Sequence, residues 1–227
     1  MRVMSIAIVS RFWVLAEQKR GAVRRVGNML RSALGLFTVL TALYGLVVPT
    51  VVGWLTVDYS PSRQYISELG AVGAPQAFGV NFGVFLPTGL LALGVVIWLA
   101  VALPRGMRLP VLLLLGIGIG NLGAVAFPCD MGCPAEGSAR QGVHNLWGAI
   151  QYFSGGGALV WLGRRGKLPV CLYAGLGVWA SLYLMGGPGQ EMRGFWQRVA
   201  EVLLYSSLPY LAWLVRRASV GVRQGIP

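Results

Sequence analysis

Charged side chains are scarce in this chain, and acidic ones are scarcest. Of 227 residues 11% are charged, and 19 basic residues stand against seven acids. Soluble domains carry about 25% charged residues, so the low share excludes an ordinary soluble domain and favours a protein whose solvent is lipid.

Histidine and cysteine are also rare, with one histidine and three cysteines in the whole chain. Zinc-dependent membrane hydrolases of the ceramidase type hold their metal with several histidines. We therefore expect no metal site here, and no motif indicates a cofactor.

Hydrophobic residues make up 56% of the chain, and the net charge is +12. A strong positive charge can indicate nucleic-acid binding, but no basic or aromatic signature of a nucleic-acid fold is present. The basic residues instead form short clusters beside apolar runs, which is the pattern of membrane loops. We expect the lipid bilayer as partner, with a lipid or small molecule as ligand, and no nucleic acid; whether there is a protein partner stays open.

Six apolar runs are long enough to span a bilayer, since about 20 apolar residues cross the hydrocarbon core. They are continuous and do not alternate with period two, which favours helices over strands. The runs cover approximately residues 33–57, 76–103, 109–127, 143–162, 168–185 and 195–215. We predict an all-α polytopic membrane protein, a bundle of six transmembrane helices over residues 33–215.

The basic residues predict the orientation of the bundle. The N-terminal segment 1–32, the loops 104–108 and 163–167, and the short basic tail 216–227 hold 15 of the 19 Lys and Arg and one acid, Glu17. By the positive-inside rule both termini are cytoplasmic and the longer loops face outward. The expected location is a bacterial inner or plasma membrane.

The N-terminal segment 1–32 permits two interpretations. Its basic clusters suit an amphipathic helix on the cytoplasmic face of the membrane, attracted by anionic lipid. Alternatively, Met29 is the true first residue.

Two of the three cysteines, Cys129 and Cys133, flank Asp130 in a short loop between two apolar runs. If this loop faces outward, the environment is oxidising and a disulfide is permitted. A redox centre or half of a metal site is the alternative, but a reactive thiolate is disfavoured beside Asp130. We expect a disulfide.

The first long loop carries signals for a short interfacial helix. Ser60 suits the N-cap, Pro61 the first helical position and Gly70 the exit. Such a helix would hold Ser67 and Glu68 above the bundle.

Two further patterns lie within the runs. Gly116 and Gly120 have the spacing at which membrane helices approach closely, so we expect a packing seam there, bridged by Asn121. Pro87 should kink the second helix by leaving the carbonyl of Gly83 unbonded.

The fourth and sixth runs each carry a polar stripe at helical spacing. The stripe residues are Gln141, His144, Asn145, Gly148, Gln151 and Tyr152, then Gln197, Arg198, Glu201 and Tyr205. Acids within a membrane span are functional by default, and we expect Arg198 to neutralise Glu201. A pocket that binds ligand through Glu68, Gln151, Arg198 and Glu201 is one interpretation; a lattice of structural hydrogen bonds is the other.

Several of these motifs together resemble a known family. The chain contains Asp58-Tyr-Ser-Pro, Ile66-Ser-Glu-Leu-Gly-Ala, Phe127-Pro-Cys-Asp followed by His144-Asn145, and Gly194-Phe-Trp-Gln-Arg. They look like the motifs of the prokaryotic integral membrane family numbered 998 among domains of unknown function, over roughly residues 33–215. The resemblance implies six helices and no established activity. The matching polar residues are Ser67, Glu68, Asp130, His144 and Arg198.

Three functions are compatible with the sequence. The first is a polar pocket at the extracytoplasmic side that binds or transports a lipid-like or small ligand. The second is an intramembrane lipid-modifying hydrolase that uses Asp130 and His144, with Ser67 as a conceivable nucleophile. The third is an accessory subunit of a membrane complex. Whether the protein is an enzyme stays open.

Overall fold

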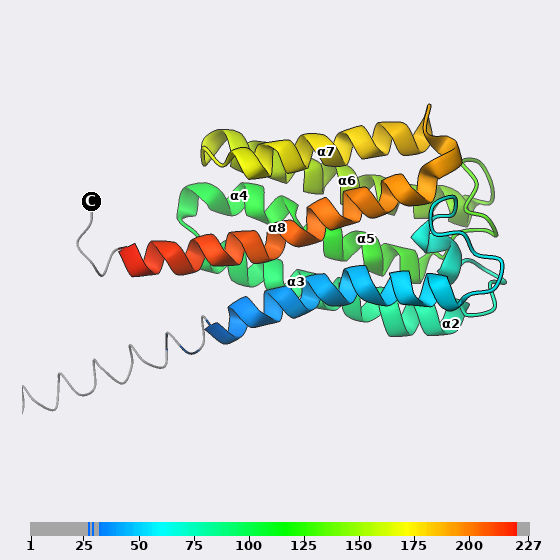
Figure 1. The fold of residues 1–227 in the computed structure, drawn as a ribbon, viewed down its shortest axis with the longest axis horizontal. Helices are drawn as coiled ribbons and strands as arrows, with labels where there is room; N and C mark the ends of the chain where they lie inside the picture. Colours follow the sequence, from blue (N-terminus) through cyan, green and yellow to red (C-terminus); the bar gives the residue numbers. More distant parts are fainter. Residues whose placement is uncertain (1–26, 28, 30–31, 222–227) are drawn as a thin grey trace, which may run out of the picture.

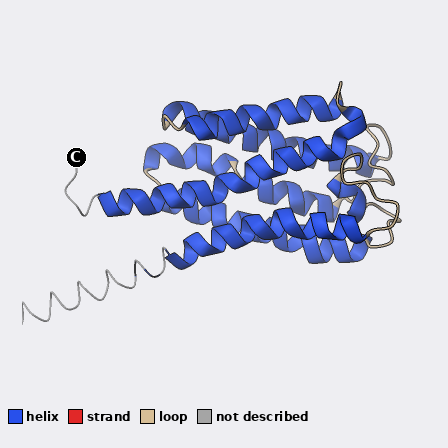
Figure 2. Cartoon of the chain, in the orientation of Figure 1, coloured by secondary structure: helices blue, strands red, loops and turns tan. Residues whose placement is uncertain are grey.

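The computed structural model describes residues 27, 29 and 32–221, and side chains up to 217. In that part of the chain all regular structure is helical (Figure 2). The predicted N-terminal segment 1–32, apart from residues 27, 29 and 32, and residues 222–227 of the predicted tail lie outside the described residues. The two interpretations of the N-terminal segment therefore stay predictions.

The described residues form six long helical segments. These segments run along one another in a bundle (Figure 1). The first is the helix Ser32–Leu55. The second comprises α2 (Ala77–Val80), η2 (Asn81–Phe85) and α3 (Leu86–Ala102), and the third α4 (Arg105–Leu113) and α5 (Leu115–Ala126). The last three are α6 (Ala139–Arg165), α7 (Pro169–Gly186) and α8 (Arg193–Gly221), with the short helices η1 (Ile66–Gly70) and η3 (Gln190–Met192) in loops.

The two ends of the bundle differ. The long loops that contain η1, the two bonded cysteines and η3 gather at one end, on the right of Figure 1. The start of the first helix, the end of α8 and the short α3–α4 and α6–α7 connections lie at the other end. The first helix packs against α8, since a Cβ on Gly45 would lie 3.0 Å from the ring of Tyr205.

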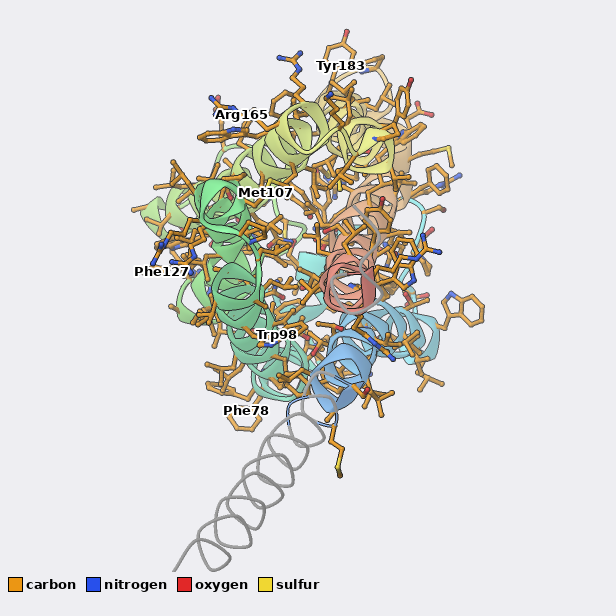
Figure 3. All side chains as sticks on the ribbon, turned by 90° about the vertical axis from the view of Figure 1, so that its left-hand side faces the viewer. Phe78, Trp98, Met107, Phe127, Arg165 and Tyr183 are labelled. Carbon is orange, nitrogen blue, oxygen red and sulfur yellow. A yellow bond between two sulfur atoms is a disulfide. The ribbon has the colours of Figure 1, made fainter. Side chains whose placement is uncertain are left out.

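The outer surface of the bundle is apolar. Figure 3, seen along the bundle, shows Phe78 and Tyr183 at its periphery, where they are 78% and 70% exposed. Four helical segments are long and apolar enough to cross a membrane: Ser32–Leu55, Ala77–Ala102, Arg105–Ala126 and Pro169–Gly186. The chain is therefore a multi-pass membrane protein.

α6 and α8 are longer than these four segments but more polar. Their polar residues are largely turned inward: Gln141 and Gln151 on α6 and Glu201 on α8 are all buried. A helix whose polar stripe faces protein can lie in a bilayer although its mean hydropathy is low. The count of six spans stays a prediction on this basis.

The predicted helix in the first long loop begins later than expected. Ser60 and Pro61 start a turn, in which Ser60 O accepts from the backbone N–H of Gln64 at 2.8 Å. The helix itself, η1, starts at Ile66 and is a 3₁₀ helix of five residues. Its start is set by Glu68, whose Oε1 accepts from the backbone N–H of Tyr65 at 2.8 Å, so the sequence-based N-cap at Ser60 was wrong.

The expected irregularity before Pro87 is present as a π-helical turn, η2. The backbone N–H of Leu86 donates to the carbonyl of Asn81, one residue further back than in an α-helix. The carbonyl of Gly83, expected to be left unbonded by Pro87, accepts a hydrogen bond from the hydroxyl of Tyr44 on the first helix. The proline is thus accommodated by a neighbouring helix, as is usual inside membranes.

The glycines of α5 form the predicted seam. A Cβ on Gly116 would lie 1.8 Å from Ser154 Oγ, and one on Gly120 would lie 2.5 Å from Gln151 Oε1, both on α6. Only glycine permits this approach. The prediction that Asn121 bridges this seam was wrong: its Nδ2 donates to the carbonyl of Ile117 in its own helix and to the hydroxyl of Tyr205 on α8 at 3.0 Å, not to α6.

Candidate functional site

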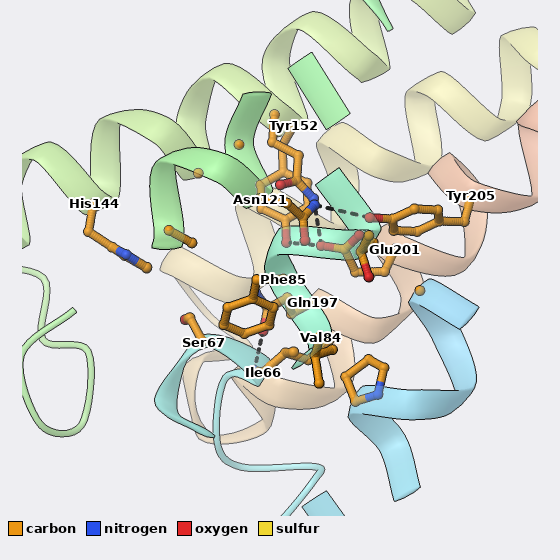
Figure 4. A pocket seen from close by; sticks show the side chains of 17 residues that line it. Ile66, Ser67, Val84, Phe85, Asn121, His144, Tyr152, Gln197, Glu201 and Tyr205 are labelled. Carbon is orange, nitrogen blue, oxygen red and sulfur yellow. Dashed lines mark hydrogen bonds between the residues drawn. The ribbon is translucent and has the colours of Figure 1, made fainter. Parts of the chain in front are cut away.

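A small polar cavity lies between the first helix, η1, η2, α3, α5, α6 and α8, toward the loop end of the bundle (Figure 4). Its volume is about 70 Å³. Figure 4 shows Ser67 and His144 on one side and Glu201 and Tyr205 on the other. The polar side chains in its wall are Ser67, Thr88, Asn121, His144, Gln151, Tyr152, Gln197, Glu201 and Tyr205.

A second, larger cavity of about 310 Å³ adjoins the first and is more open. The two share part of their walls, including Ser67, His144, Tyr152 and Gln197. The outer cavity is also lined by Leu182 and Met185 of α7, so it has an apolar side. We call the larger one the vestibule and the smaller one the inner cavity.

Glu201 is the acid of the inner cavity and is 8% exposed. Its Oε1 accepts two hydrogen bonds, from Gln151 Nε2 at 2.8 Å and from the hydroxyl of Tyr152 at 2.6 Å. Its Oε2 is buried and has no hydrogen-bond partner among the described residues. A buried carboxyl oxygen without a partner is costly, because its desolvation is not compensated.

The expected pairing of Arg198 with Glu201 is not formed. Arg198 points to the first long loop, where its Nη1 donates to the carbonyls of Pro61 and Gln64 and its Nη2 donates to the hydroxyl of Tyr59 at 2.8 Å. These contacts occupy Nη1 and Nη2, whereas the buried Nε of Arg198 has no hydrogen-bond partner among the described residues. Glu201 bonds to α6 instead. Residues three apart on a helix are neighbours, but neighbours form an ion pair only when their side chains have no better partners elsewhere. Here the first long loop supplies such partners for Arg198.

Glu68 forms an ion pair with Arg193, which was not among the predicted site residues. Arg193, the first residue of α8, donates from Nη2 to Glu68 Oε1 at 2.9 Å and to the carbonyl of Gly132 at 3.1 Å. Its guanidinium also lies over the ring of Tyr65, 4.6 Å from the centroid. Glu68 is 7% exposed and lies away from the inner cavity.

Asp130 and His144 are not joined in the structure. The Asp130 carboxylate accepts from the backbone N–H of Ser138 and from Arg140, each at 2.8 Å. These two bonds, the backbone one first, hold the pKa of Asp130 below its usual value. His144 Nδ1 bonds instead to the carbonyl of Phe127 at 2.9 Å. A relay Ser67–His144–Asp130 is therefore not assembled, and the catalytic roles of these residues stay predictions.

Cys129 and Cys133 are bonded to each other, with their Cα atoms 5.2 Å apart. They lie beneath η1: Cys133 Sγ is 3.4 Å from Ser67 Oγ, and Cys129 Sγ is 3.5 Å from Ser67 O. The redox state of the pair in the native membrane stays a prediction.

Of the four predicted ligand-binding residues, Gln151 and Glu201 line the inner cavity, while Glu68 and Arg198 tie the first long loop to α8. Thr88 was not among the predicted residues, although it lines the same cavity and its buried Oγ1 has no hydrogen-bond partner in the described chain. It is a lone hydroxyl one residue after Pro87, and nothing in its spacing distinguishes it from other membrane threonines.

Comparison with known proteins gives one match. The model of the family described as Protein of unknown function (DUF998) matches residues 39–215. This range covers all six long helical segments in whole or in part. No curated protein and no solved structure matches the chain.

Proposed function

We propose that this chain, which belongs to the DUF998 family of proteins of unknown function, binds a lipid-like or small ligand in the inner cavity and vestibule. The polar end of the ligand donates a hydrogen bond to Glu201. The observation that carries the proposal is that Glu201 lines a cavity while its buried Oε2 has no hydrogen-bond partner in the described part of the chain.

The surroundings of Glu201 favour a ligand over a purely structural role. A structural acid in a membrane protein is expected to pair with a cation or to have all its oxygens bonded. Gln151 and Tyr152 occupy Oε1 and hold the carboxyl group in place. Thr88 Oγ1 is a second unbonded polar atom in the same wall. Two such residues in one wall suit a small polar group of a ligand.

The two cavities together suit an amphipathic molecule. Pockets for small ligands are mostly apolar and carry a few placed polar groups. The inner cavity, at about 70 Å³, holds several waters or one small polar group. The vestibule, at about 310 Å³ and with Leu182 and Met185 in its wall, has room for an apolar part.

The ligand enters from the extracytoplasmic side in this proposal. Both cavities lie toward the end with the long loops, whereas the described basic residues Arg105, Arg108, Arg164, Arg165 and Lys167 belong to the short connections at the other end (Figure 1). The positive-inside rule makes that other end cytoplasmic. Cysteine-accessibility labelling tests this: positions 104–108 and 163–167 should react only from the cytoplasmic side.

Native mass spectrometry of the protein in mild detergent tests binding. Wild type should retain a non-protein mass, or bind one from a lipid extract of the source membrane, and Glu201→Gln should lose it. Glu191→Gln is the matched control, because Glu191 is exposed in η3. Equal retention by wild type and Glu201→Gln would show that Glu201 does not hold the ligand.

A further inference from the structure

The cysteines and the single histidine meet in the structure. The Sγ atoms of Cys129 and Cys133 and a ring nitrogen of His144 lie within 4.8 Å of one another. All three residues are nearly inaccessible, at 0%, 5% and 9% exposure. The histidine comes from α6 and the cysteines from the loop before it, so the fold supplies the third donor that the sequence pattern lacked.

The histidine makes the backbone hydrogen bond that metal-binding histidines usually make. Its Nδ1 is 2.9 Å from the carbonyl of Phe127. Because a carbonyl only accepts, Nδ1 carries the proton and Nε2 keeps its lone pair. Histidines that bind metals usually donate their other N–H to a backbone carbonyl or a carboxylate in this way.

The cysteines are held by the backbone independently of the bond between them. The N–H of Cys133 donates to the carbonyl of Asp130 at 2.9 Å, across a turn in which Gly132 has a φ of 77°. The carbonyl of Cys129 accepts from the N–H of Val72 at 2.9 Å. These bonds remain when the sulfurs are separated, so reduction should leave both side chains beneath η1.

We propose that the reduced form of this cluster is a zinc site, with the thiolates of Cys129 and Cys133 and Nε2 of His144 as ligands. A dithiol reductant opens the bond: two electrons and two protons pass to the cysteine sulfurs while the reductant becomes a disulfide. Zn²⁺ then displaces the two thiol protons. With Zn–S near 2.3 Å and Zn–N near 2.0 Å, tetrahedral ligand atoms lie about 3.5–3.8 Å apart, which small side-chain rotations reach.

The fourth position of such a site faces the vestibule. Cys133 and His144 both line that cavity. Ser67 Oγ, 3.4 Å from Cys133 Sγ, can donate a hydrogen bond to the thiolate. Three protein ligands with one open position are typical of zinc ions that bind water or substrate, whereas structural zinc has four protein ligands. The pair thus has two states, a disulfide when oxidised and a zinc ion facing the vestibule when reduced.

Metal titration of the full-length protein in detergent tests the proposal. The protein is reduced with a phosphine under anaerobic conditions, and Zn²⁺ is titrated against a chromophoric chelator; Co²⁺ serves as the spectroscopic probe of thiolate ligation. We expect one ion per reduced chain, a thiolate-to-cobalt absorption band, and none in the oxidised protein. Cys133→Ser and His144→Ala should weaken binding by about tenfold or more.

Cys171→Ser is the control, because Cys171 is buried in α7, away from the cluster, and its loss should leave binding unchanged. Circular dichroism checks the fold after reduction. The proposal is overturned if the folded, reduced chain binds no Zn²⁺, if His144→Ala binds as tightly as wild type, or if reduction unfolds the chain. Each of these results is independent of whether Glu201 binds a ligand.

Discussion

Two buried acids, Glu68 and Glu201, have similar exposure but opposite surroundings. Glu68 is 7% exposed and meets the guanidinium of Arg193, the side chain of Gln64 and the backbone N–H of Tyr65. Glu201 is 8% exposed and meets two neutral donors, both on one oxygen. The fold pairs the first acid with a cation, whereas the second lines a cavity and has one oxygen without a partner among the described residues.

The comparison shows that burial alone does not identify a functional acid. Both carboxylates lose their water on folding, and that loss must be compensated by partners. For Glu68 the compensation comes from the chain itself and joins η1 to α8. For Glu201 the compensation is incomplete among the described residues. We therefore propose that a ligand supplies the missing hydrogen bond. The following predictions test this difference.

Removing the cation of Glu68 should have the largest effect. Arg193→Leu leaves a buried carboxylate unpaired and should lower the free energy of unfolding by about 3 kcal/mol, the low end for a broken buried pair, because the Arg193 side chain is 24% exposed. Denaturant unfolding in detergent micelles measures it. The double variant Arg193→Leu, Glu68→Leu should recover most of the loss; if it does not, the pair is not what Arg193 contributes.

The second-largest loss of stability should come from crowding the inner cavity beside Glu201. In Gly120→Ala the new methyl would lie 2.5 Å from Gln151 Oε1 and 2.6 Å from its Cβ, so Gln151, which donates to Glu201, must shift. Overpacking of this kind costs about 1–3 kcal/mol. Gly94→Ala is the control, since its methyl meets no atom within 4 Å. The thermal midpoint of Gly120→Ala should be clearly lower than that of Gly94→Ala. Equal midpoints would mean that the contact between α5 and α6 can accommodate a methyl group without loss of stability.

Coupling between Arg198 and Glu201 should be small. The two make no ion pair in the described structure, so a double-mutant cycle with Arg198→Met and Glu201→Gln should be additive within about 0.5 kcal/mol. The same cycle for Arg193 and Glu68 should give a large coupling. A coupling energy above about 1 kcal/mol between Arg198 and Glu201 would contradict the claim that Glu201, unlike Glu68, has no cation as partner.

The smallest effect concerns Asp130, at the exposed rim. Its pKa is lowered in the folded protein, chiefly by the N–H of Ser138 and then by Arg140. The stabilisation is thus present above the unfolded pKa of about 3.9 and is lost as the pH falls through the folded pKa. Thermal midpoints of wild type and Asp130→Asn should differ at pH 7 and should begin to converge only as the pH falls below about 4. Glu136→Gln, exposed in the same loop, should run parallel to wild type throughout.

The sequence predicted the helices well because each depends on local information. Apolar run length located the six helical segments, with ends shifted by a few residues, as where the third begins at Arg105 and not at 109. The inward face of α6 followed from helical spacing for Gln141, His144, Gln151 and Tyr152, which are all buried. Asn145 of the same predicted stripe is exposed, and Gly148 is half-buried. The proline at 87 indicated the position of the irregular turn, although not that Tyr44 would bond Gly83.

The partners of the charged residues could not be predicted in the same way. Arg198 was paired with Glu201 because they are close in sequence, yet its hydroxyl partner is Tyr59, 139 residues away. Glu68 and Arg193 are 125 residues apart. Which cation reaches which acid depends on how the first long loop folds over α8, and this depends on backbone carbonyls that carry no sequence signal. The meeting of His144 with the two cysteines has the same origin.

An experimental density map of the protein in a lipid nanodisc tests the central claim most directly. We predict non-protein density in the inner cavity, within hydrogen-bonding distance of Oε2 of Glu201 and near Oγ1 of Thr88, with Arg198 still on the carbonyls of Pro61 and Gln64. A map in which Arg198 turns onto Glu201, or in which Oε2 is bonded to the protein and the cavity is closed, would contradict the claim that this acid is reserved for a ligand.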